Sequence, residues 1–87
     1  MYVILVYDVN VSRVAKVLKV GRRYLTWVQN SVLEGELTGT QFEKLKREIA
    51  SVIDESEDSI LFYVLRTEKW LEKHRIGLAK GEPEWLV

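Results

Sequence analysis

The sequence predicts a two-layer α+β sandwich in which two helices cover one face of an antiparallel sheet. The first observation is the order of the hydrophobic patterns, which predict a strand, a helix, a middle segment of one or two strands, a second helix and a last strand. The second is the length of 87 residues, which fits one compact domain. Two strand–helix–strand units in a domain of this size favour a single sheet with both helices packed on it.

The first strand and the first helix are predicted from the N-terminal third of the chain. Residues 2–7 are continuously apolar and rich in β-branched and aromatic side chains, as is typical of a central strand, and Asp8 ends the run. Asn10 and Ser12 are suitable N-caps for a helix of about 12 to 14 residues. Its apolar positions recur at helical spacing: Val11, Val14, Leu18 and Leu25, with Val17 and Tyr24 beside them.

The middle of the chain returns to a strand pattern over residues 27–37. Asn30, Ser31 and Gly35 interrupt this pattern. Glycine and asparagine are common both in turns and at irregular points inside strands. One bent strand and a tight pair of strands therefore both fit residues 27–37.

A second helix and a last strand complete the sandwich. Thr40 followed by Glu43 matches a capping box, which predicts that a helix starts there and ends near Asp54. Its apolar positions are Phe42, Leu45, Ile49, Val52 and Ile53. Residues 59–65 are apolar on both alternating sets of positions, which predicts another strand.

The formal net charge is zero, but the charges are divided along the chain. Residues 9–33 contain no acid, whereas residues 34–58 carry eight acids and three bases. A solvated helix usually mixes both signs, so the basic helix favours a polyanion such as nucleic acid over a merely solvated face. The candidate nucleic-acid-binding residues are Arg13, Lys16, Lys19, Arg22 and Arg23.

The chain divides into a core domain over residues 1–66 and a C-terminal strand and tail over residues 67–87. The sheet face away from the helices is apolar, so a second subunit is expected to cover it. An additional strand is predicted around residues 75–79, and it is expected to add to a neighbouring sheet. The apolar end is expected to pack on a partner subunit or protein through Trp85, Leu86 and Val87.

Several classes of site and location are excluded or disfavoured by composition. The chain has no cysteine, which excludes disulfides, thiolate metal sites and cysteine nucleophiles, and His74 is its one histidine. No apolar run reaches membrane-spanning length, and the N-terminus lacks the basic and small-residue features of a signal peptide. A cytoplasmic protein without membrane contact is expected.

Three stretches together resemble the Cas2 family of CRISPR-associated proteins. They are "VYDV" at the end of the first strand, Arg13 at the start of a basic helix, and "VQNSVLEGEL" in the middle. The resemblance covers roughly residues 1–66. It implies a ferredoxin-like βαββαβ fold and a homodimer whose sheets face each other, with the additional C-terminal strand exchanged between subunits.

The resemblance also implies a function in CRISPR spacer acquisition, a defence against foreign nucleic acid. The partners would be the Cas1 integrase, double-stranded DNA and single-stranded RNA. The implied activity is that of a metal-dependent endoribonuclease or endonuclease using Mg²⁺ or Mn²⁺. Asp8 would be the catalytic and metal-binding residue, Tyr7 would act beside it, and Arg13 would hold substrate phosphate.

A metal-binding role for Asp8 can also be argued from its chemistry, without the family resemblance. A hard cation such as Mg²⁺ prefers oxygen ligands and keeps several waters, so a pair of Asp8 carboxylates across a two-fold axis would suffice. The alternative is that Asp8 only ends the strand or caps the turn. Two other functions stay open from sequence: a toxin-like mRNA interferase and a small regulatory ferredoxin-like domain that binds a ligand.

Overall fold

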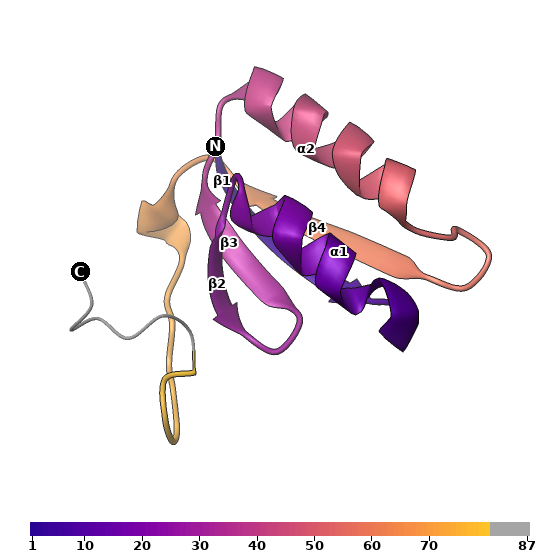
Figure 1. Ribbon diagram of the computed structural model, residues 1–87. Coiled ribbons are helices and arrows are strands. Elements are labelled where there is room, and N and C mark those ends of the chain that lie inside the picture. Colours follow the sequence, from indigo (N-terminus) through magenta and orange to yellow (C-terminus); the bar gives the residue numbers. More distant parts are fainter. Residues whose placement is uncertain (81–87) are drawn as a thin grey trace.

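Four strands form one antiparallel sheet, and both helices lie on the same side of it (Figure 1). The computed structural model describes residues 1–80. In chain order the elements are β1 (Tyr2–Asp8), α1 (Val11–Arg22), β2 (Thr26–Gln29), β3 (Val32–Glu36), α2 (Gly39–Val52), β4 (Ser59–Leu65) and the short 3₁₀ helix η1 (Glu68–Trp70). The ferredoxin-like α+β fold is confirmed.

β1 lies inside the sheet, between β3 and β4, in the strand order β2-β3-β1-β4. Leu5 of β1 is opposite Leu33 of β3 on one side and Phe62 of β4 on the other. This position explains why residues 2–7 are apolar throughout, because a central strand has a neighbour at each edge and buries much of both faces. The largest fully buried side chains are Val3, Leu5, Val17, Leu33, Leu45 and Ile49.

Residues 27–37 form a tight pair of strands, which decides between the two arrangements that the sequence left open. The turn passes through Asn30, whose φ of 40° lies in the left-handed region. Asparagine tolerates this region better than most residues. The Trp27 indole Nε1 donates a hydrogen bond to the Asn30 carbonyl at 2.9 Å and so closes the turn. Gly35 lies within β3 and does not interrupt it.

Of the two N-caps predicted for the first helix, Asn10 caps α1 and Ser12 lies inside it, whereas the predicted cap of α2 is wrong. The Asn10 side chain accepts a hydrogen bond from the Ser12 amide at 2.9 Å. In α2 the capping box joins Thr38 and Gln41, not Thr40 and Glu43. Thr38, two residues after the end of β3, has the extended backbone that an N-cap needs, so the helix begins earlier than expected.

The chain beyond β4 forms η1 and then has neither helix nor strand over residues 71–80. Residues 75–79 therefore form no strand within the single chain. A strand needs a hydrogen-bonding edge, and this segment does not pair with the sheet of its own chain. Its exchange into a second subunit stays a prediction. Trp85, Leu86 and Val87 lie outside the described residues. Within residues 1–80, no helix is both long and apolar enough to cross a membrane.

Candidate functional site: the Asp8 edge of the open sheet face

Asp8 is the last residue of β1, and its side chain is exposed on the sheet face that the helices leave uncovered. Successive residues of a strand point to opposite faces. Val3, Leu5 and Tyr7 belong to the core beneath the helices. Ile4, Val6 and Asp8 therefore point the other way, onto what is called here the open face.

The open face is apolar next to Asp8. On β4, Tyr63 is opposite Ile4 and Leu61 is opposite Val6, while Ser59 is opposite Asp8. Leu61 is 47% exposed and Tyr63 is 54% exposed, so two large apolar side chains of the edge strand β4 are open to solvent. The carboxylate thus lies at one end of an apolar strip in which Ile4 and Val6 are half-buried and Leu61 and Tyr63 are exposed.

Tyr7, which was predicted to act with Asp8, is not brought together with it. Its side chain is only 3% exposed and belongs to the core on the helix side of the sheet. Burial raises the pKa of the Tyr7 hydroxyl, and a hydrogen bond with Ser31 opposes this shift. Because Asp8 points to the other face, Tyr7 cannot orient that carboxylate within one chain.

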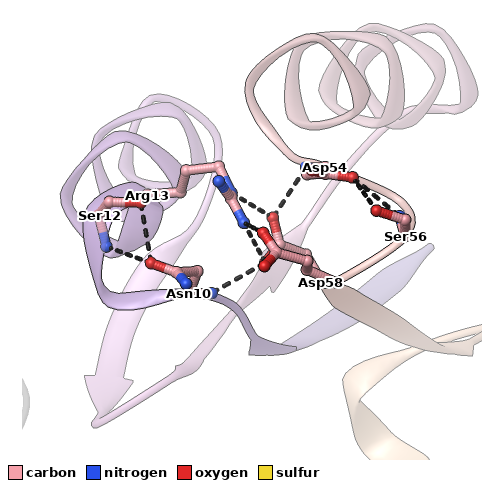
Figure 2. A network of polar contacts seen from close by, with 7 residues as sticks. Asn10, Ser12, Arg13, Asp54, Ser56 and Asp58 are labelled. Carbon is pink, nitrogen blue, oxygen red and sulfur yellow. Dashed lines mark hydrogen bonds and ion pairs between the residues drawn. The ribbon is translucent and has the colours of Figure 1, made fainter.

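Arg13 is held by two acids of the loop between α2 and β4 (Figure 2). Its Nε donates to Asp58 Oδ2 at 2.5 Å and its Nη2 donates to Asp58 Oδ1 at 3.1 Å. The same Nη2 donates to Glu57 Oε2 at 2.7 Å. These bonds raise the pKa of the guanidinium above its usual range. A substrate phosphate at Arg13 would have to compete with both carboxylates.

Asp58 is the residue that the sequence analysis missed. Its side chain is fully buried, although it ends a loop rich in acids. Besides Arg13, it accepts hydrogen bonds from the backbone amides of Asn10 and Asp54, both at 2.8 Å. The hydrogen bonds from Arg13 are the main reason that the pKa of Asp58 is held well below its usual range. The one available signal was an acid immediately before a predicted strand.

The other predicted basic residues lie on the solvent side of α1 and just beyond it. Lys16, Lys19, Arg22 and Arg23 are all exposed. Lys16, Lys19 and Arg23 recur at three- and four-residue spacing, which places them on one face, and Arg22 lies to one side of it. The four residues together are called here the basic face. Arg23 also forms an ion pair with Glu48 of α2, with 3.5 Å between Nη1 and Oε2. Arg13 is half-buried and directed toward Asp58, so it does not belong to this face.

Comparison with known proteins decides the family. A sequence profile described as CRISPR associated protein Cas2 matches residues 1–73. The chain belongs to the Cas2 family. A relative named CRISPR-associated endoribonuclease Cas2 in Thermotoga maritima is 58% identical over 86 residues and covers 99% of both chains. Another of that name in Dictyoglomus turgidum is 54% identical over 87 residues, the full length of both.

Solved structures of Cas2 proteins have the same fold. A crystal structure of Cas2 with 43% identity superimposes with a TM-score of 0.85, over 95% of this chain and 92% of that chain. The crystal structure of Streptococcus pyogenes Cas2 at pH 6.5 is 35% identical, with a TM-score of 0.73, and covers 86% of this chain and all of that chain. The resemblance noted in the sequence is thereby confirmed.

The Cas2 family implies a divalent metal, and within one chain Asp8 could supply only half of the site for it. The carboxylate is a hard oxygen ligand of the kind that Mg²⁺ and Mn²⁺ prefer, and it is exposed. Within residues 1–80, no three His, Cys, Asp or Glu side chains gather closely enough to hold a metal ion. The neighbouring acid Asp58 is occupied by Arg13. A second copy of Asp8 would supply the missing ligand.

Proposed function

We propose that this chain is a homodimeric, nucleic-acid-binding component of CRISPR adaptation, with a metal-dependent phosphodiesterase site built from two copies of Asp8. The observation that carries the proposal is the exposed Asp8 carboxylate at the end of the apolar strip. The names of the relatives, which call those proteins endoribonucleases, support the cleavage activity. Family membership favours this function over the toxin-like and ligand-binding alternatives.

The homodimer follows from the open face. An apolar strip that contains half-exposed Leu61 and Tyr63 is stabilised when another apolar surface removes it from water. A second copy of the same strip is the simplest such surface, because a two-fold axis makes one patch complementary to itself. A two-fold axis parallel to the strands would bring the two Asp8 residues to the same edge of the interface.

The chemistry follows from the paired carboxylates. Two carboxylates at close range repel each other, and a divalent cation between them removes the repulsion. When bound there, Mg²⁺ would neutralise charge on a phosphodiester and promote its attack by water. The side chains of Asp8 would hold the ion from both subunits, and the exposed hydroxyl residue Ser59 lies opposite each carboxylate.

The nucleic acid would lie along the basic face. Lys16, Lys19 and the arginines after them contact phosphates without reading bases, so binding depends on charge and on the shape of the backbone. Two such faces in a dimer suit double-stranded DNA held for spacer acquisition with the Cas1 integrase. Single-stranded RNA is the second substrate class, and it would use the same phosphate contacts.

The test is the Asp8→Asn variant in a cleavage assay with Mg²⁺ on single-stranded RNA and double-stranded DNA. Cleavage is expected to fall by at least about a hundredfold, because the metal loses its charged ligand in both subunits. Glu55→Gln is the matched control, since it removes an exposed carboxylate of the α2–β4 loop. Cleavage by Asp8→Asn equal to that of the control would reject Asp8 as the metal-binding residue.

A further inference from the structure

We infer that Asp58 is the positioning residue for Asp8, and that Arg13 acts in this positioning by holding Asp58 rather than by contacting substrate phosphate. The inference rests on the proposed function of Asp8 and names the device that fixes its carboxylate. Figure 2 shows the network: the start of α1 and the loop before β4 meet at the carboxylate of Asp58.

Asp58 ties the chain just after Asp8 to the start of β4. The Asn10 amide, two residues beyond Asp8, donates to Asp58 Oδ1 at 2.8 Å. Across the sheet, Asp8 is opposite Ser59, the residue that directly follows Asp58. The path from β1 into α1 is therefore tied to the start of β4 at two neighbouring points. The orientation of the Asp8 side chain depends on this path, because Asp8 is the last residue of the strand.

Each oxygen of Asp58 accepts two hydrogen bonds. Oδ1 accepts from the Asn10 amide and from Arg13 Nη2, and Oδ2 accepts from the Asp54 amide and from Arg13 Nε. A carboxylate suits this arrangement because both oxygens are acceptors only. An asparagine amide would place an NH₂ donor against N–H donors at one of the two positions. Asp58→Asn therefore breaks part of the network with almost no change in side-chain volume.

Arg13 is committed to the network on geometric grounds. The guanidinium contacts Asp58 through two nitrogens, and this planar, two-point contact is the strongest arrangement of an arginine with a carboxylate. The Arg13 side chain is 21% exposed. Of its two acid partners, Glu57 is the exposed one, at 54%. Arg13 thus joins α1 to the acidic loop and leaves the phosphate contacts to the basic face.

The positioning matters because a metal shared between subunits needs both carboxylates in a fixed geometry. Catalytic and metal-binding groups must be held within about 0.5 Å of their productive positions. Removing a residue that hydrogen-bonds a metal-binding residue typically lowers metal affinity or activity by about 10- to 100-fold. A dimer contains the Asp58 network twice. A substitution at Asp58 would therefore displace both halves of the site together.

The experiment compares wild type, Asp58→Asn and Glu57→Gln by three measurements. The first is amide hydrogen exchange at Val9 and Asn10 in the metal-free protein, the second is Mn²⁺ binding by calorimetry, and the third is kcat and KM for Mg²⁺-dependent cleavage. Glu57→Gln is the control, because it removes only the exposed partner of Arg13. If Asp58→Asn does not fold, Arg13→Lys, which keeps the charge but loses the two-point contact, takes its place.

For Asp58→Asn we expect faster exchange at Asn10, Mn²⁺ binding weaker by about tenfold or more, and a similar fall in kcat with KM within about twofold. A residue that only stabilised the fold would not separate kcat from KM in this way. If Arg13 instead bound substrate, Asp58→Asn would free it, and KM would fall while Mn²⁺ binding stayed unchanged. That result overturns the inference.

The two proposals fail in different ways. If wild type cleaves and Asp8→Asn does not, but Asp58→Asn binds Mn²⁺ and cleaves like wild type, the proposed function stands and the positioning role is wrong. If wild type neither binds Mn²⁺ nor cleaves, the proposed metal site at Asp8 is wrong, and the positioning role is rejected with it. Exchange at Asn10 and Mn²⁺ binding that are both unchanged in Asp58→Asn also reject the positioning role, whatever the activity.

Discussion

Tyr7 and Asp8 are consecutive residues of β1, yet their side chains lie on opposite faces of the sheet. Tyr7 is buried under the helices, whereas Asp8 is exposed on the open face. The alternation of a strand makes this unavoidable, since neighbouring side chains cannot share a face without a bulge. The two residues therefore have separate roles, one in the core and one at the candidate metal site.

Tyr7→Phe is accordingly expected to leave Mg²⁺-dependent cleavage within about twofold of wild type, because the ring still fills its place in the core. Tyr7→Ala is expected to lower the free energy of unfolding by about 3–5 kcal/mol, the usual cost of removing a buried aromatic ring. Urea unfolding measures the second effect. A tenfold or greater loss of cleavage in a folded Tyr7→Phe would restore a role for the hydroxyl at the site.

The open face is expected to hold the dimer together through Leu61 and Tyr63 of β4. Replacing both with glutamate would place charge inside the interface, so the dimer should dissociate and Mg²⁺-dependent cleavage should be lost with it. Light scattering after size-exclusion chromatography measures the mass. Val64→Glu is a matched control, because Val64 is 49% exposed on the same strand but opposite Val3, on the helix side. A dimer that survives the double substitution would place the interface elsewhere.

Much of the fold could be predicted because it depends on local pattern. The apolar run of β1 and the helical spacing of α1 are visible in consecutive residues. The cap of α2 could not be ranked, since Thr38 with Gln41 and Thr40 with Glu43 both match a capping box. Which of the two capping boxes is used depends on where the preceding strand pair ends, and that depends on the whole sheet.

The candidate site was predicted only in part, because its contacts are non-local. Asp8 was identified from its place at a strand end. Arg13 was grouped with the basic residues around it, because its sequence neighbours share its charge. Its partner Asp58 is 45 residues away, and no sequence pattern joins the two. The strand expected at residues 75–79 does not form within the single chain, and its exchange stays a prediction, since strand pairing depends on a partner edge that lies outside the segment itself.

The basic face is expected to bind duplex DNA through salt-sensitive contacts. Reversing Lys16 and Lys19 to glutamate should weaken binding across all sequences and make its salt dependence shallower. Each phosphate contact that is lost lowers the slope of log K against log salt by about 0.9. Titrations at several salt concentrations, read by fluorescence anisotropy, measure both quantities. The same reversal at Lys44 and Arg47 of α2 is the control, and equal effects from the two pairs would show only a dependence on net charge.

The Arg13–Asp58 pair is expected to make stability depend on pH in the acid range. The pKa of Asp58 is lowered in the folded chain, so the pair stabilises the fold fully above the unfolded-state pKa of about 4. This contribution is lost as the pH falls toward the lowered value, because protonation then removes the charge that Arg13 binds. Urea unfolding should show wild type more stable than Asp58→Asn at pH 6, with the difference narrowing at pH 3. A constant difference would mean that the charge of Asp58 is not what stabilises the fold.

Glu34 of β3 ties the segment after η1 to the open face. Glu34 is buried, with only 6% of the residue exposed. The Tyr2 hydroxyl donates a hydrogen bond to Oε2 at 2.7 Å, and Lys73 forms an ion pair with Oε1. Burial and the neighbouring Glu34 raise the pKa of Tyr2 above its usual range, so the hydroxyl keeps its proton and remains a donor. Residues 71–76 line a groove of about 800 Å³ over β2 and β3, where Arg75 also donates to Gln29 at 3.1 Å.

Lys73→Met is therefore expected to loosen residues 71–76, because it leaves the buried Glu34 without its cation. Hydrogen exchange over this segment should become faster, while exchange in β1 stays unchanged. The free energy of unfolding should fall by only about 1 kcal/mol, since Lys73 is about half exposed and water partly replaces the ion pair. Lys69→Met, an exposed lysine of η1, is the control. Unchanged exchange in Lys73→Met would show that the other contacts of the groove, among them the Arg75–Gln29 hydrogen bond, hold the segment without the ion pair.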